Sequence, residues 1–148
     1  ISFRAKYLSP GNTGPKMEVE LVSGGRWALH EQAGKVVIVQ FSFKGCGPCE
    51  RQYPVLRQIA SDYPEKVSIV SLMADDTIEA TREAVDSGKM TWNVAWDGKD
   101  GPVATQWGIR EFPTVYIFGI DQKLLGSGNI PAEYLAEIVK AIVSQDLE

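Results

Sequence analysis

The feature that most constrains the fold of this chain is an apolar run that ends at a pair of cysteines. Residues 36–43 are apolar at almost every position, which is the pattern of a central strand buried on both faces. The tetrapeptide at 46–49, Cys-Gly-Pro-Cys, contains both cysteines of the chain. A helical pattern then runs over 47–61, with a kink expected at Pro54. Two thiols at the mouth of a helix, after a buried strand, are suited to thiol–disulfide exchange.

The rest of the chain alternates between strand-like and helix-like patterns. This order indicates an α/β sandwich with a mixed sheet. Residues 1–14 are expected to be irregular, and residues 15–146 to form the domain. The expected elements are strands at 17–22, 26–29, 67–73, 90–97, 114–118 and 123–126, and helices at 77–87, 102–107 and 131–144, the first of these capped by Asp75, Asp76 or Thr77.

Composition limits the classes of function. A chain of 148 residues with 44% hydrophobic residues can build one well-cored domain. Its net charge of −4 argues against nucleic acid and anionic membranes as partners. Two cysteines and one histidine are too few for a structural zinc site or a multi-disulfide scaffold. We therefore expect no metal and no organic cofactor, the reactive group being a Cys46–Cys49 disulfide.

The position of each cysteine predicts its role. Cys46 falls at the start of the helix, where unpaired N–H groups and the positive end of the helix dipole favour a thiolate. Lys44 adds a positive charge nearby, whereas Glu50 opposes it. Cys49 lies one turn into the helix and should be more buried. We therefore expect Cys46 to attack and Cys49 to resolve the mixed disulfide. The alternative, a pair of structural cysteines, is disfavoured by the strand–CxxC–helix context.

Three separated motifs together resemble the thioredoxin superfamily over nearly the whole chain. They are Phe41 followed by the cysteine motif and Pro54, the segment 107–114 (Trp-Gly-Ile-Arg-Glu-Phe-Pro-Thr), and Gly128 before the last helix. The resemblance implies a thioredoxin-like three-layer α/β/α sandwich with a mixed central sheet.

The same resemblance implies that the Phe112–Pro113 bond is cis and lies beside the cysteines. Backbone groups exposed there could pair with an extended substrate strand. An ordinary trans proline that begins an edge strand is the alternative.

Two additions narrow the resemblance to exported TlpA/ResA-like thiol–disulfide oxidoreductases. These are the N-terminal strand pair with its following segment 34–41, and the inserted helix within 75–97. The resemblance implies an extracytoplasmic protein of the periplasm or cell envelope, secreted or membrane-anchored through a segment outside this sequence. It also implies protein substrates with disulfides and an upstream thiol reductant, a membrane electron donor being one option. We expect a monomer.

The sequence departs from these relatives at two acidic positions. Thioredoxins carry a buried acid six residues before the first cysteine, and ResA-like proteins carry one three residues after the second. Here these positions are Gln40 and Gln52. Such an acid accepts the proton of the resolving cysteine, which glutamine cannot do. Glu50 and Glu111 are the candidate proton acceptors; a water molecule, or a role as solvated surface charges, is the alternative for both.

The function predicted from these features is reduction of protein disulfides. Gly47-Pro48 is the dipeptide that reductive thioredoxins use. The alternatives are a disulfide oxidase or isomerase of the same fold, and a thioredoxin-fold binding module with weak redox activity. A peroxiredoxin-type peroxidase is disfavoured, because Phe43 and Val39 stand where such enzymes need a threonine or serine and a proline.

Overall fold

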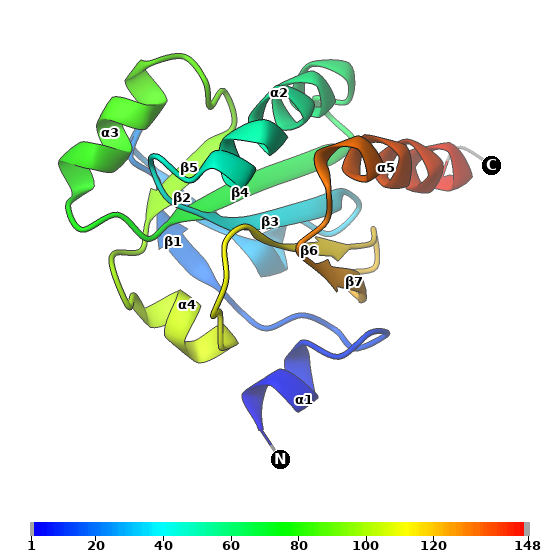
Figure 1. Ribbon diagram of the computed structural model, residues 1–148. Helices are drawn as coiled ribbons and strands as arrows, with labels where there is room; N and C mark the ends of the chain where they lie inside the picture. Colours follow the sequence, from blue (N-terminus) through cyan, green and yellow to red (C-terminus); the bar gives the residue numbers. More distant parts are fainter. Residues whose placement is uncertain (1, 147–148) are drawn as a thin grey trace.

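A five-stranded mixed sheet forms the centre of the computed structural model, which describes residues 2–146 (Figure 1). Its strand order is β5-β4-β3-β6-β7. The first three strands run parallel, and the last two are antiparallel to their neighbours. The strands are β3 (Val36–Ser42), β4 (Val67–Met73), β5 (Asn93–Trp96), β6 (Thr114–Phe118) and β7 (Leu124–Gly128).

Helices and a strand pair cover the two faces of this sheet (Figure 1). One face packs against α2 (Gly47–Asp62), α3 (Ile78–Asp86) and α5 (Ala132–Asp146). The opposite face packs against α1 (Phe3–Tyr7), α4 (Pro102–Trp107) and the strand pair β1 (Glu18–Glu20) and β2 (Arg26–Ala28). A 3-10 turn at Leu29–Glu31 directly follows β2. The expected three-layer sandwich, with its N-terminal strand pair and inserted helix α3, is therefore confirmed.

Strand β3 is buried along its whole length, as its apolar sequence predicts. Val36 and Ile38 face the core shared with α2 and α5. Val37 and Val39 face the second core, which contains the fully buried Trp107. Because both faces are apolar, the strand can lie only in the middle of the sheet, and its end is therefore held rigidly where the cysteine loop begins.

The N-terminal segment corrects one expectation. Residues 3–7 form α1 instead of an irregular chain. The Ser2 hydroxyl accepts a hydrogen bond from the Ala5 N–H (3.1 Å), and the Phe3 and Tyr7 rings pack one turn apart at 5.0 Å. A helix of five residues is too short to show a periodic pattern, so no sequence signal predicts it. Residues 11–13 then pair with residues 123–124 of the sheet edge.

The other expected elements form with shifts at their ends. The strand predicted at 90–97 is restricted to β5, and the last strand continues to Gly128. Thr77, among the three candidates, caps α3, since its hydroxyl accepts a hydrogen bond from the Ala80 N–H (3.2 Å). None of the helices in residues 2–146 is both long and apolar enough to cross a membrane.

Candidate active site

Cys46 and Cys49 form a disulfide at the N-terminus of α2, with their Cα atoms 5.2 Å apart. Cys46 is the N-cap residue, and its sulfur accepts a hydrogen bond from the Cys49 N–H (3.3 Å). The Cys46 side chain retains 5% exposure, whereas Cys49 is fully buried. Gly45, which precedes the pair, has φ +87°, a conformation that glycine adopts without strain. The strand can therefore turn sharply into the helix and present Cys46 first.

The helix terminus favours negative charge on Cys46. The Cys49 N–H that faces its sulfur is one of the donors that a helix start leaves unpaired, and the helix dipole adds to its effect. Gly47 and Pro48 lie on the surface between the cysteines. Neither carries a charge, so thiolate stabilisation at this position comes from the backbone of α2.

An aromatic pair joins the cysteine loop to the segment before β6. The Phe112–Pro113 bond is cis, as the resemblance implies. The Phe112 ring packs edge-on against the Phe43 ring, with centroids 5.4 Å apart. The carbonyl of Phe43 in turn accepts a hydrogen bond from the Cys46 N–H (3.2 Å). The proline segment and the attacking cysteine are thus held together through Phe43.

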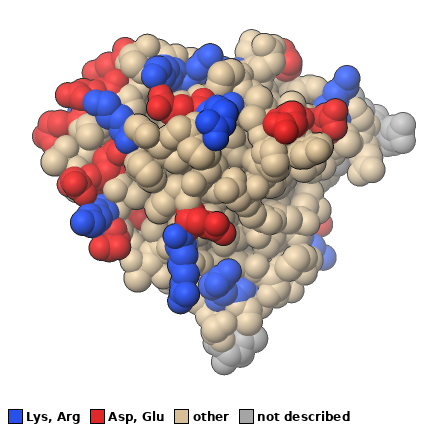
Figure 2. All heavy atoms as spheres, in the orientation of Figure 1, with Lys and Arg blue, Asp and Glu red and all other residues tan. Residues whose placement is uncertain are grey.

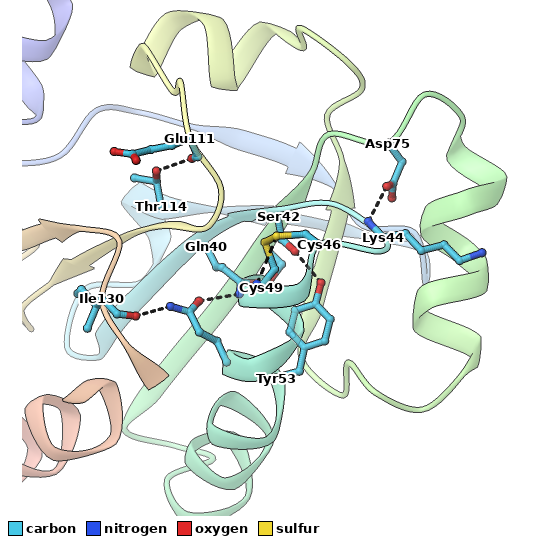
Figure 3. The surroundings of a disulfide bond; sticks show 12 residues. Gln40, Ser42, Lys44, Cys46, Cys49, Tyr53, Asp75, Glu111, Thr114 and Ile130 are labelled. Carbon is cyan, nitrogen blue, oxygen red and sulfur yellow. Dashed lines mark hydrogen bonds between the residues drawn. A yellow bond between two sulfur atoms is a disulfide. The ribbon is translucent and has the colours of Figure 1, made fainter. Parts of the chain in front are cut away.

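The two glutamines that replace the acids of the relatives bond to each other beneath the cysteines (Figure 3). The Gln40 side-chain amide donates to Gln52 Oε1 (3.0 Å), and the Gln52 amide donates to the Ile130 carbonyl (2.6 Å). Gln40 accepts in turn from the Ser71 hydroxyl (2.6 Å), which accepts from the Trp92 indole N–H (2.8 Å). Each member of this chain of donors finds a partner, and none of them can titrate.

A second buried polar pair also joins α2 to β3. The Tyr53 and Ser42 hydroxyls share a hydrogen bond of 2.6 Å (Figure 3). Burial raises the pKa of Tyr53 to about 12, an effect that the bond to Ser42 partly offsets. Tyr53 therefore stays protonated at physiological pH and does not serve as a base there. The sequence reasoning missed both residues, although a serine within an apolar strand was a signal of a buried partner.

The charged candidates for the site point elsewhere. The Lys44 ammonium pairs with Glu83 of α3, which raises the pKa of Lys44. Glu50 forms an ion pair with Lys89 (2.8 Å). Glu111 is exposed, and its side chain extends away from the disulfide (Figure 3). Within residues 2–146, no hydrogen bond joins any of these side chains to a cysteine.

Asp75 is placed differently from the helix cap that the sequence suggested. It is 7% exposed, and its carboxylate bonds to the backbone N–H of Lys44 and to the hydroxyl of Thr81. It thus links the cysteine loop to α3. In the part of the chain that the structure describes, no three His, Cys, Asp or Glu side chains gather as a metal site would require.

The comparisons with known proteins agree with this geometry. The model of the AhpC/TSA family matches residues 10–126. Thiol-disulfide oxidoreductase ResA of Bacillus thuringiensis subsp. konkukian is 30% identical over 135 residues, covering 89% of this chain and 78% of the relative.

Two solved structures show the same fold. The thioredoxin domain of a thiol-disulfide oxidoreductase from Bacteroides vulgatus has a TM-score of 0.78 at 23% identity, covering 90% of this chain and 96% of that one. A secreted disulfide oxidoreductase of Mycobacterium tuberculosis, homologous to DsbE of E. coli, has a TM-score of 0.73 at 20% identity, covering 84% and 95%. This chain accordingly belongs to the AhpC/TSA family and is a thiol–disulfide oxidoreductase related to ResA.

Proposed function

We propose that this oxidoreductase works as a reductant of protein disulfides. The Cys46 thiolate attacks one sulfur of a substrate disulfide, forming a mixed disulfide and releasing a substrate thiolate. Cys49 then loses its proton and attacks the Cys46 sulfur, which releases the second substrate thiolate. Two electrons pass to the substrate, and the Cys46–Cys49 disulfide seen in the structure remains. An upstream dithiol returns two electrons and two protons, and no metal or organic cofactor takes part.

The observation that carries this proposal is the asymmetry of the pair at the helix terminus. Cys46 caps α2 and is the less buried of the two, while Cys49 is enclosed behind it. Attack on an outside disulfide therefore begins at Cys46, and the enclosed Cys49 attacks the Cys46 sulfur of the mixed disulfide.

The surroundings of the pair support reduction over oxidation. A strongly oxidising pair needs its thiolate stabilised by nearby cations. Here the residues between the cysteines are Gly47 and Pro48, and the ammonium of Lys44 is paired with Glu83. The helix terminus alone should lower the pKa of Cys46 only modestly below its ordinary value of about 8.5.

An apolar surface beside the cysteines supports a polypeptide substrate. Phe43 is 36% exposed and follows β3, and Trp96 is 40% exposed and ends β5; the C-terminal ends of these parallel strands lie on the same side of the sheet as the start of α2. Figure 2 shows charged side chains of both signs over α3, whereas the neighbouring surface between the start of α2 and α4 carries few. Exposed aromatic side chains of this kind are typical of surfaces that bind protein.

The test combines an insulin-reduction assay with a measurement of the reduction potential of the Cys46–Cys49 pair. Wild-type protein should reduce insulin disulfides with a thiol donor, Cys46→Ser should be inactive, and Cys49→Ser should accumulate the mixed disulfide. Equilibration with glutathione should give a potential toward about −270 mV, while a value near about −120 mV would assign the oxidase role. Equal inactivity of wild type and Cys46→Ser would favour a binding module.

We further propose that the protein acts outside the cytoplasm as a monomer, with a membrane electron donor as one possible reductant. The similarity to a secreted oxidoreductase supports the location, and disulfide-bearing substrates are found mainly in such compartments. Thiol trapping of Cys46 in fractionated cells would test the compartment, and light scattering would test the oligomeric state.

A further inference from the structure

A buried carboxylate connects the cysteine loop with the inserted helix. Asp75 follows β4, and its carboxylate oxygens each accept one short hydrogen bond. One comes from the backbone N–H of Lys44 (2.7 Å) and the other from the hydroxyl of Thr81 in α3 (2.6 Å). Its own carbonyl accepts from the indole N–H of Trp96 (2.8 Å). The Asp75 side chain therefore ties the loop after β3 (Figure 3) to α3, alongside the Lys44–Glu83 ion pair, and its backbone carbonyl contacts the end of β5.

This contact acts on the attacking cysteine because it holds the loop just before it. Lys44 is two residues before Cys46, and Gly45 between them has φ +87° and no side chain. The glycine leaves the loop free to move unless its neighbour is tied. In residues 2–146 the Lys44 N–H bonds only to Asp75. The loop that leads to Cys46 is thus tied to a carboxylate in the segment after β4, in addition to the bond from the Cys46 N–H to the Phe43 carbonyl.

The same carboxylate places a negative charge near the pair. Residues 2–146 contain no ion pair to Asp75. The Lys44 ammonium is paired with Glu83, and Asp75 adds a weaker attraction that also raises the Lys44 pKa. Bond lengths along the chain keep its oxygens within about 14 Å of the Cys46 sulfur. The other charged or titratable groups around the loop are Tyr53, which stays neutral, and the Glu50–Lys89 ion pair.

We propose that Asp75 is a positioning residue of the cysteine pair, which fixes the loop that presents Cys46 and whose buried negative charge keeps the pair reducing. A negative charge disfavours the thiolate of the reduced form, so the disulfide form gains relative stability and the dithiol gives up electrons more readily. The inference rests on the proposed reductase function. It assigns to the inserted helix the task of holding Asp75 through Thr81.

The substitution Asp75→Asn removes the negative charge and keeps both hydrogen bonds of the side chain. The asparagine carbonyl can still accept from the Lys44 N–H, and its amide can donate to the Thr81 hydroxyl, which then acts as acceptor. Loss of a unit charge at the limit of about 14 Å, with an effective dielectric constant of about 20–40, should lower the Cys46 pKa by about 0.4–0.9 unit, and by more if the charge lies closer. The reduction potential should become less negative. Asp76→Asn is the matched control, because Asp76 is the next residue, carries the same charge and is exposed.

The substitution Thr81→Val removes one hydrogen bond to Asp75 and keeps the negative charge. It removes the hydroxyl that holds the carboxylate and keeps nearly the same volume. The rate of insulin reduction should fall at least about threefold, while the Cys46 pKa stays within about 0.2 unit of wild type. If Asp75→Asn does not fold, Thr81→Val alone tests the positioning role of Asp75. A wild-type rate of insulin reduction in Thr81→Val would overturn that role.

The Cys46 pKa is measured from the ultraviolet absorbance of the thiolate in the reduced protein. An unchanged or higher value in Asp75→Asn, or an equal shift in Asp76→Asn, overturns the electrostatic role. The measurement needs no substrate. A wild type that fails to reduce insulin, yet shows the expected pKa difference, would therefore contradict the proposed function and leave the role of Asp75 intact.

Discussion

Replacing Gln52 by glutamate tests the neutral hydrogen-bond chain beneath the cysteines. Gln52 is 1% exposed; its oxygen accepts from Gln40, and its amide donates to the carbonyl of Ile130. A protonated carboxyl group can make both bonds, since its carbonyl oxygen accepts and its hydroxyl donates. A carboxylate cannot, because it would face the Ile130 carbonyl with no proton between the two oxygens. The site therefore selects the neutral acid.

The loss of stability in Gln52→Glu follows from the pKa of the introduced carboxyl group in the folded and unfolded states. Its unfolded value is about 4.3. Burial and the bond to a carbonyl should raise the folded value to about 7. The variant is thus close to wild-type stability below about pH 4.3, and loses about 1.4 kcal/mol per pH unit as pH rises toward the folded value. Above about pH 7 the loss levels off at about 3–4 kcal/mol.

Urea unfolding of the oxidised proteins, from about pH 4 to pH 8, measures this difference without cysteine titration. Gln106→Glu is the control, since Gln106 is exposed on α4 and the charge change is identical. The control should show a small and nearly constant difference from wild type. If the difference for Gln52→Glu does not grow with pH, the neutral-chain reasoning is refuted.

Two further substitutions test packing around the site. Tyr53→Phe should cost about 1–2 kcal/mol in urea unfolding, because the buried Ser42 hydroxyl loses its partner. It should leave the pH dependence of activity unchanged up to about pH 9, since the pKa of Tyr53 is about 12; a shifted profile would show that the phenol titrates. Gly14→Ala should cost about 1–3 kcal/mol, since the added Cβ would lie 2.5 Å from a ring carbon of the buried Phe118. Gly126→Ala, where a Cβ meets nothing within 4 Å, is its control, and equal melting temperatures for both would contradict the expected clash.

Local patterns in the sequence predicted most of the fold. The apolar run of β3 is buried throughout, and the cysteine motif begins α2 where the pattern placed it. The short helix α1 was missed, because its stability depends on a cap and one aromatic contact. The replacement of two acids by Gln40 and Gln52 was visible in the sequence, but their direct bond was not.

The reactive group and its setting can be read from the order of residues alone, because a buried strand, a CxxC motif and a helix start are adjacent in the chain. Which polar side chains meet around that group depends on how distant elements pack. Gln52 reaches a carbonyl 78 residues away, and Asp75 reaches an N–H 31 residues away. Such pairs form because buried polar groups must find partners among whatever the packed elements bring close. The packing of β3, β4, α2 and α3 therefore sets the surroundings that tune the cysteines.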